Sequence, residues 1–179
     1  MKKETLKTVG FPRSGNTFLN YSLKLLYYPE EDVNYCYHTT ISFNKFLNVI
    51  VPLRNPLDSI ASWHLLPYLS HGDIDDHLRF YLRLSNAFIE NKQKCLFMDF
   101  DIFINDIEYI KNKINSYFGY TCDKNTSIND IKDFINKNGF VDSLPRNNKD
   151  DLDKVKIDIL DNKLYNNCEN IYQELKKLL

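Results

Sequence analysis

The chain contains no long apolar segment of the kind that marks export or membrane insertion. Residues 1–5 are polar and lead directly into a short apolar segment, and no stretch approaches the roughly 20 apolar residues that a transmembrane helix requires. We therefore expect a cytoplasmic protein that has no membrane partner.

An excess of positive charge is also absent. The 23 lysines and arginines are balanced by 24 aspartates and glutamates, so the net charge is -1. Such a balance gives no general attraction to nucleic acid, and we expect no nucleic-acid partner.

The sequence has no C-x-x-C pair among its four cysteines, which are widely spaced. This spacing predicts reduced thiols rather than a disulfide framework. Three histidines, His64, His71 and His77, lie close together in the sequence, but no cysteine or carboxylate pattern completes a ligand set around them. We expect no metal.

The residues that are present indicate a folded protein. A length of 179 residues with 43% hydrophobic residues suits one domain, and no repeat or linker divides it. We predict a single domain over 1–179, with a nucleotide-binding core at 1–120 and a mostly helical part at 121–179.

Apolar periodicity predicts the elements of that domain. The expected strands are 6–11, 33–37, 49–53 and 95–100. The expected helices are 17–26, 56–66, 74–91, 107–118 and 128–138, followed by one or two helices from 150 to 179 that break near Asn166. Alternation of this kind is typical of an α/β fold, and we predict a central parallel sheet of four or five strands flanked by helices.

A tight loop joins the first strand to the first helix. It has the pattern Gly10-x4-Gly15-Asn16-Thr17, one residue away from the phosphate loop G-x-x-x-x-G-K-[ST], with Asn16 at the lysine position. The cation stands earlier, at Arg13. Backbone N–H groups and the helix dipole at such a loop favour an anion, so we expect phosphate or sulfate chemistry and a fold related to the P-loop nucleotide-binding proteins.

A second candidate anion site follows the strand 49–53. Arg54 stands at its carboxyl end, Asn55 and Pro56 suit a helix start, and Ser62 lies about two helical turns further on. Because ligands bind at the carboxyl ends of parallel strands, Arg54 and Ser62 suit a terminal phosphate. Two such sites predict a ligand with two separated anionic groups.

Together the two segments resemble the sulfotransferases that use 3′-phosphoadenosine 5′-phosphosulfate. Residues 12–18, Pro-Arg-Ser-Gly-Asn-Thr-Phe, look like the family's loop for the 5′-phosphosulfate. Arg54-Asn55-Pro56-Leu57-Asp58 with Ser62 looks like its 3′-phosphate motif. The resemblance covers roughly the first 65 residues, and a weaker similarity extends to about residue 120.

The resemblance implies an activity and a set of residues. The chain would move a sulfuryl group from the donor to a hydroxyl or amine of a small-molecule or saccharide acceptor, release adenosine 3′,5′-bisphosphate and need no metal. Arg13 would bridge the leaving phosphate and the sulfuryl group, and Arg54 with Ser62 would bind the 3′-phosphate. The residues implied for the 5′-phosphate are Pro12, Arg13, Ser14, Gly15, Asn16, Thr17 and Phe18.

Further roles follow from the same resemblance. His38 is our candidate for the general base, with Glu30 or Glu31 as the alternatives. Arg146 would close over the 3′-phosphate, with Lys149 as a further candidate. Trp63 and Phe100 are candidates to stack on the adenine, and each is equally compatible with a place in the core.

Two other functions remain open. A nucleotide or small-molecule kinase would need a lysine next to Thr17 and a metal-binding aspartate at a strand end, for which Asp99 is the one fair candidate. A binding module without turnover would keep the nucleotide pocket and transfer nothing. The acceptor and the oligomeric state are not readable from the sequence.

Overall fold

Four parallel strands form the sheet at the centre of the protein. A computed structural model describes residues 6–27, 36–37, 49–66, 72–122, 124–138 and 149–179. The strands are β1 (Lys7–Val9), β2 (Cys36–Tyr37), β3 (Val49–Leu53) and β4 (Cys95–Asp99), in the order β2-β1-β3-β4. β1 pairs with β2 and β3, and β3 pairs with β4.

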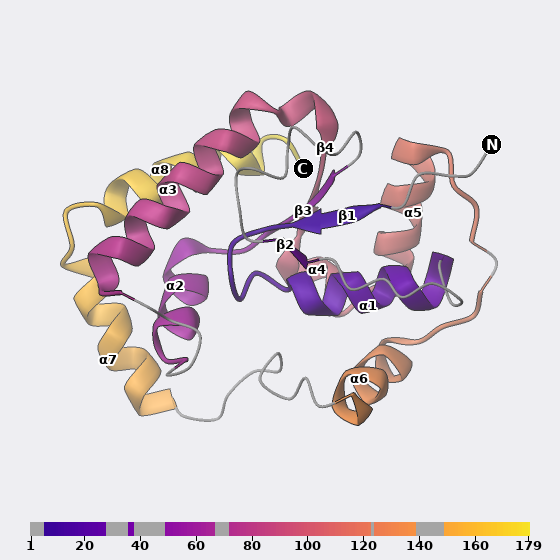
Figure 1. The fold of residues 1–179 in the computed structure, drawn as a ribbon, viewed down its shortest axis with the longest axis horizontal. Helices are drawn as coiled ribbons and strands as arrows, with labels where there is room; N and C mark the ends of the chain where they lie inside the picture. The colour runs from indigo at the N-terminus through magenta and orange to yellow at the C-terminus, as the bar shows by residue number, and fades with distance from the viewer. Residues whose placement is uncertain (1–5, 28–35, 38–48, 67–71, 123, 139–148) are drawn as a thin grey trace.

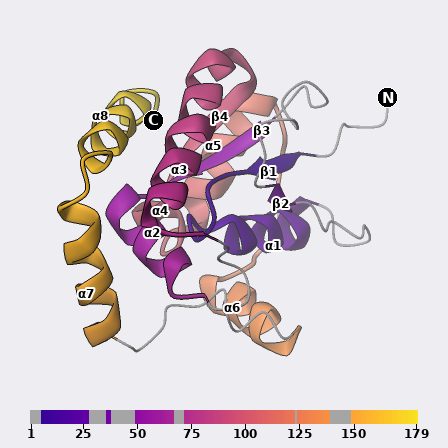
Figure 2. The ribbon, with the colours of Figure 1, turned by 60° about the vertical axis from the view of Figure 1, so that its left-hand side comes forward.

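Helices cover both faces of this sheet (Figure 1). They are α1 (Asn16–Tyr27), α2 (Pro56–His64), α3 (Ile74–Glu90), α4 (Phe100–Phe103), α5 (Ile107–Phe118), α6 (Ile128–Lys137), α7 (Lys149–Leu160) and α8 (Tyr165–Lys176). The views in Figures 1 and 2 place α2, α3, α7 and α8 on one side of the sheet and α1, α5 and α6 on the other.

The alternation of side chains along β3 produces this three-layer arrangement. Val49 and Val51 point into the cluster under α3 and α8, whereas Ile50 points into the cluster under α1 and α5. All three side chains are fully buried, because a parallel strand covered on both faces has no side that meets water. In β4, Phe97 and Met98 continue the same alternation.

The predicted fold class is confirmed at the level of an α/β protein with a parallel sheet flanked by helices. The sheet is small: β1, β3 and β4 have three to five residues each, and β2 contributes only two. The strand predicted at 95–100 ends one residue early, because Asp99 caps α4 by accepting a hydrogen bond from the N–H of Asp101 at 2.9 Å.

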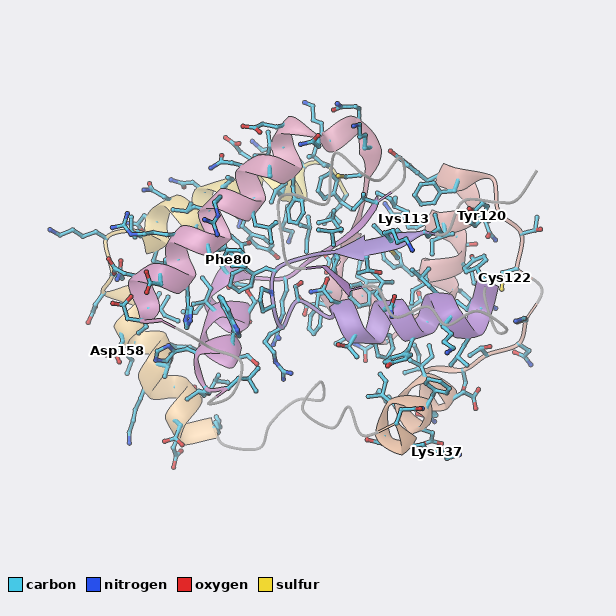
Figure 3. The ribbon with its side chains drawn as sticks, in the orientation of Figure 1. Phe80, Lys113, Tyr120, Cys122, Lys137 and Asp158 are labelled. Carbon is cyan, nitrogen blue, oxygen red and sulfur yellow. The ribbon has the colours of Figure 1, made fainter. Side chains whose placement is uncertain are left out.

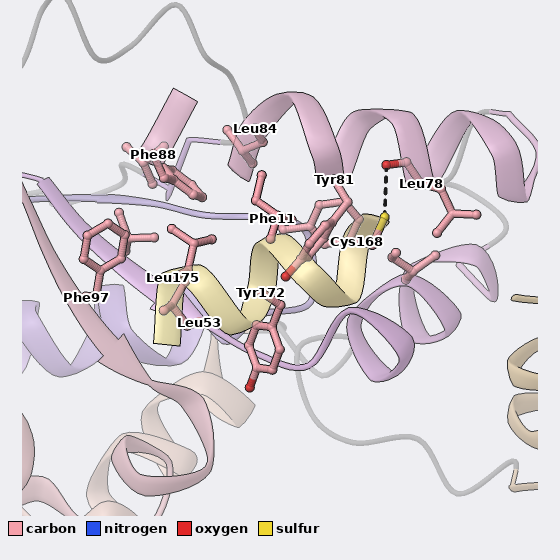
Figure 4. Packing of buried hydrophobic residues seen from close by; sticks show 14 of the residues in the cluster. Phe11, Leu53, Leu78, Tyr81, Leu84, Phe88, Phe97, Cys168, Tyr172 and Leu175 are labelled. Atoms are coloured by element: carbon pink, nitrogen blue, oxygen red, sulfur yellow. Dashed lines mark hydrogen bonds between the residues drawn. The ribbon is translucent and has the colours of Figure 1, made fainter. Parts of the chain in front are cut away.

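The C-terminal part has two helices, α7 and α8, and the break between them lies at a different position from the predicted one. The break lies at residues 161–164 instead of near Asn166. Asn162 causes it, because its side-chain oxygen accepts from the N–H of Leu164 at 2.9 Å and so competes with the helical pattern. The α8 side chains then pack under α3, where the thiol of Cys168 meets the carbonyl oxygen of Leu78 (Figure 4).

The predicted thiol state is confirmed for the described side chains. Cys95, Cys122 and Cys168 are free, and burial raises the pKa of the Cys95 and Cys168 thiols to about 12. Cys122 lies with Tyr120 beside the carboxyl end of α1 (Figure 3), 3.4 Å from the carbonyl oxygen of Leu26. None of the helices in the described ranges combines the length and the apolar content that crossing a bilayer requires.

Replacing a buried leucine should destabilise the protein much more than replacing an exposed one. Leu78 is fully buried in α3, whereas Leu160 in α7 is 53% exposed. We expect Leu78→Ala to lower the free energy of unfolding by about 2–5 kcal/mol, because a cavity remains in the core, and Leu160→Ala to change it by less than about 0.5 kcal/mol. Urea denaturation followed by circular dichroism measures both, and equal losses would contradict the packing described here.

Candidate anion-binding site

The loop after β1 begins with a tight turn that has an arginine in an unfavourable position. The N–H of Ser14 donates to the carbonyl oxygen of Phe11 at 3.2 Å, so residues 11–14 form a β-turn. Pro12 occupies its second position, and Arg13 has a φ of 65° at the third. Glycine usually fills a left-handed position of this kind, because other residues lose on the order of 1–2 kcal/mol there.

Side chains within the loop hold this turn in place. The hydroxyl of Ser14 donates to the Phe11 carbonyl at 2.6 Å, and the amide of Asn16 donates to the same carbonyl at 2.7 Å and to the Ser14 hydroxyl at 3.2 Å. Ser14 and Asn16 are both buried. The Asn16 amide group, which stands at the lysine position of a phosphate loop, therefore bonds inward to its own loop.

The first turn of α1, next to this loop, has backbone N–H groups that can donate hydrogen bonds. Within the described part of the chain, the N–H groups of Gly15, Asn16 and Thr17 have no acceptor, as expected for the first turn of a helix. The half-buried Thr17 hydroxyl likewise makes no hydrogen bond to the described residues. Phe18 differs, because its buried ring packs on Phe103. The backbone N–H groups of the loop and the Thr17 hydroxyl could therefore donate hydrogen bonds to an anion.

Gly15 is required by its surroundings. Its φ is 89°, and a Cβ atom there would lie 2.7 Å from the ring of Phe103 and 2.8 Å from that of Phe100. The two rings come from α4, directly after β4. Because they pack against Gly15, they limit how closely the loop can approach α4. No pattern in the sequence indicates this contact with Gly15.

Arg54, at the carboxyl end of β3, reaches across to the loop. One terminal nitrogen of its guanidinium donates to the carbonyl oxygen of Arg13 at 2.8 Å, and the group lies over the ring of Phe100, 4.4 Å from its centre. Among the described residues no carboxylate comes within 4 Å of Arg54. Burial lowers its pKa from the usual value, and the charges of Asp58 and Asp101 act in the opposite direction.

Ser62 on α2 completes the group. The Nε of Arg13 donates to its hydroxyl oxygen at 3.0 Å, so the two segments that the sequence predicted as separate anion sites are in direct contact. They meet where the sheet order reverses, because the chain leaves β1 towards β2 while β3 lies on the other side of β1. In open α/β sheets this switch point is where ligands bind.

A small pocket adjoins this group on the side of α3 and α8. Arg54, Ser14 and Ser85 are polar members of its lining, and most of the wall is aromatic or aliphatic. It is lined by Phe11, Ser14, Pro52, Leu53, Arg54, Tyr81, Ser85, Phe88 and Leu175. Because these neighbours are mostly apolar, the Arg54 charge is solvated less than it would be in water, which favours an anionic ligand.

The two candidates for adenine stacking have different positions. Trp63 packs edge-on against Phe11, with 5.2 Å between ring centres, and lies 4.2 Å from the ring of His77. It therefore belongs to the aromatic cluster between α2 and α3. Phe100 lies at the site itself, but it already carries Arg54 on its ring.

Several predicted site residues fall outside the described residues. These are Glu30, Glu31, His38 and Arg146, and also His71 of the histidine group. Lys149 is described and is the first residue of α7. In the described ranges no three histidine, cysteine or acidic side chains gather as a metal would require. His64 and His77 face one another, with 3.3 Å between their Nδ1 atoms.

The kinase alternative has little support in this geometry. The Asp99 carboxylate accepts the N–H of Asp101 and thereby caps α4. Asn16 directs its amide into the loop, where a kinase would place a lysine next to the phosphates. One oxygen of Asp99 is therefore already used as a helix cap, and Asn16 supplies no cation at the lysine position.

Replacing Gly15 tests whether the aromatic contact holds the loop. Gly15→Ala should lower the free energy of unfolding by about 2 kcal/mol or more, because strain in φ adds to the clash with Phe100 and Phe103. Gly119→Ala is the matched control. Gly119 has a φ of 66° and nothing within 4 Å of its added Cβ, so we expect a loss of only about 1 kcal/mol. Equal losses in urea denaturation would show that the rings do not restrain the loop.

Comparison with known proteins adds nothing to this description. No family model, no curated protein and no solved structure matches the chain. The chemistry of the site follows from the loop after β1, the end of β3 and the first turns of α2.

Proposed function

We propose that the chain is a sulfotransferase that uses 3′-phosphoadenosine 5′-phosphosulfate as the sulfuryl donor. The observation that carries this proposal is the meeting of Arg13, Arg54 and Ser62 at the carboxyl ends of β1 and β3. A donor with an anionic group at each end of a ribose suits two arginines and two groups of hydrogen-bond donors on neighbouring strands.

In this proposal the loop binds the 5′-phosphosulfate. The N–H groups of Gly15, Asn16 and Thr17 and the Thr17 hydroxyl donate to its oxygens, and the positive end of α1 adds to the attraction. This geometry also supports the proposed relation to the P-loop nucleotide-binding folds. Each hydrogen bond to a charged group contributes about 1.5–3 kcal/mol, so several can hold the donor without a metal ion.

Arg54 and Ser62 bind the 3′-phosphate. Arg54 keeps its bond to the Arg13 carbonyl through one nitrogen and offers other N–H groups to the phosphate. The Ser62 hydroxyl turns from the Arg13 side chain to the phosphate, and the Arg13 guanidinium turns to the 5′ end. Phe100, under Arg54, keeps the guanidinium plane in position.

The transfer step needs charge stabilisation more than covalent chemistry. An oxygen or nitrogen of the acceptor attacks sulfur, the bond between sulfur and the bridging phosphate oxygen breaks, and the acceptor proton passes to a base. Arg13 neutralises the charge that develops on the bridging oxygen. His38 is the proposed base, with Glu30 or Glu31 as the alternatives, and Arg146 is proposed to close over the 3′-phosphate.

Binding of the product nucleotide tests the site without knowledge of the acceptor. Adenosine 3′,5′-bisphosphate at about 100 times its Kd should stabilise the protein by about 2.7 kcal/mol and raise its Tm by roughly 5–10 °C. Arg54→Lys should weaken binding about tenfold, because a lysine cannot reproduce the planar group of donors. The matched control is Arg79→Lys in α3, where the 67% exposed arginine pairs with Asp75.

Turnover is measured separately, with donor carrying labelled sulfate and a panel of phenols, amines and saccharides in the presence of a chelator. Label should reach at least one acceptor without divalent metal. Bisphosphate binding with no transfer to any acceptor would indicate a binding module. Magnesium-dependent transfer of phosphate from ATP, with no response to the bisphosphate, would overturn the proposal.

A further inference from the structure

Tyr172 on α8 combines a buried ring with a hydroxyl that makes no hydrogen bond to any residue that the structure describes. The residue is 6% exposed, and its ring packs in the core cluster under α3 and α8. Figure 4 shows the hydroxyl directed away from the other labelled side chains. A tyrosine that leaves water usually bonds its hydroxyl, as Tyr165 on the same helix does with Glu169 at 3.3 Å. The Tyr172 hydroxyl is therefore a donor that the described part of the fold does not use.

This hydroxyl lies at the edge of the sheet where Arg54 stands. α8 packs against β3, and Leu175, one helical turn after Tyr172, lines the pocket that contains Arg54. The charges of Asp58 and Asp101 act on both the Arg54 guanidinium and the Tyr172 hydroxyl, so the two groups share a pair of neighbouring carboxylates. Both groups therefore lie at the carboxyl ends of β3 and β4, where ligands bind in open α/β sheets.

The hydroxyl keeps its proton in neutral solution. Burial, together with the charges of nearby carboxylates, raises the pKa of Tyr172 to about 12, so the group can donate a hydrogen bond to an anion. Two of these carboxylates already have partners, because Asp58 pairs with Lys156 at 2.6 Å and Asp99 accepts the N–H of Asp101 at 2.9 Å. The hydroxyl thus supplies a donor at this edge without adding charge.

We propose that the Tyr172 hydroxyl is a further binding group for the phosphate that Arg54 holds, and that it donates a hydrogen bond to one of the phosphate oxygens. This inference rests on the proposed function, in which that group is the 3′-phosphate of the nucleotide. Arg54 has one nitrogen bonded to the Arg13 carbonyl and its plane on Phe100, so its remaining N–H groups and the Tyr172 hydroxyl contact different oxygens of one phosphate. Tyr172 thereby favours a nucleotide with a 3′-phosphate over one that lacks it.

Titration calorimetry with adenosine 3′,5′-bisphosphate and adenosine 5′-monophosphate tests the inference. Tyr172→Phe keeps the ring and should lower the affinity for the bisphosphate about tenfold, because one hydrogen bond to a charged group is lost. The affinity for the monophosphate, which has no 3′-phosphate, should change by less than about twofold. Tyr117→Phe is the matched control, because it removes a hydroxyl on α5 that bonds to the Gln93 carbonyl at 3.4 Å and should change neither affinity. Circular dichroism checks that both variants are folded.

The outcomes separate this inference from the proposed function. If the unmodified protein binds the bisphosphate and Tyr172→Phe binds it equally well, or loses the same factor for both nucleotides, the role of Tyr172 is overturned and the proposed function stands. If neither nucleotide binds, inorganic pyrophosphate is the remaining probe. A tenfold weaker binding of pyrophosphate by Tyr172→Phe would then support the role of Tyr172 and overturn the proposed function, whereas equal binding or none would overturn both.

Discussion

The hydrogen bond from Arg54 to the carbonyl oxygen of Arg13 joins the ends of two neighbouring strands, and the geometry of the site depends on it. A left-handed arginine persists only where its surroundings leave it no better conformation. Here the bonds to the Phe11 carbonyl close the turn from inside, Arg54 binds it from the side, and the rings under Gly15 set its height. The strained residue is thereby placed where α1 begins.

Charge at this point is balanced in an unusual way. Among the residues that the structure describes, the Arg54 guanidinium has an aromatic ring and a carbonyl oxygen as neighbours, whereas most arginines that leave water pair with a carboxylate. Asp58 and Asp101 act on it only from a distance, and Asp58 itself pairs with Lys156 of α7 at 2.6 Å. A site built in this way retains positive charge, and an anionic ligand is the natural partner for it.

Much of the fold could be predicted from local pattern. β3 and the start of α2 follow from an apolar run, a capping asparagine and a proline, and the structure has the Asn55 side chain accepting the N–H of Leu57. Gly119 ends α5 in a left-handed conformation, as glycine commonly does after a helix. Two of the errors came where polar side chains competed with a periodic pattern, as Asp99 does at α4 and Asn162 does before α8, because hydrophobic periodicity does not register such caps. The strand predicted at 6–11 is shorter, because Phe11 already belongs to the turn after β1.

The sequence by itself determined which segments become strands and helices and that an arginine with nearby hydroxyl side chains follows each of β1 and β3, because these properties depend on neighbours a few positions away. Only the tertiary structure decided that Arg13 bonds to Ser62, 49 positions further on, and that Phe100 lies between Gly15 and Arg54. Those contacts depend on the strand order β2-β1-β3-β4 and on where the chain leaves each strand of the sheet. No local pattern encodes that arrangement, since it results from the packing of all the layers together.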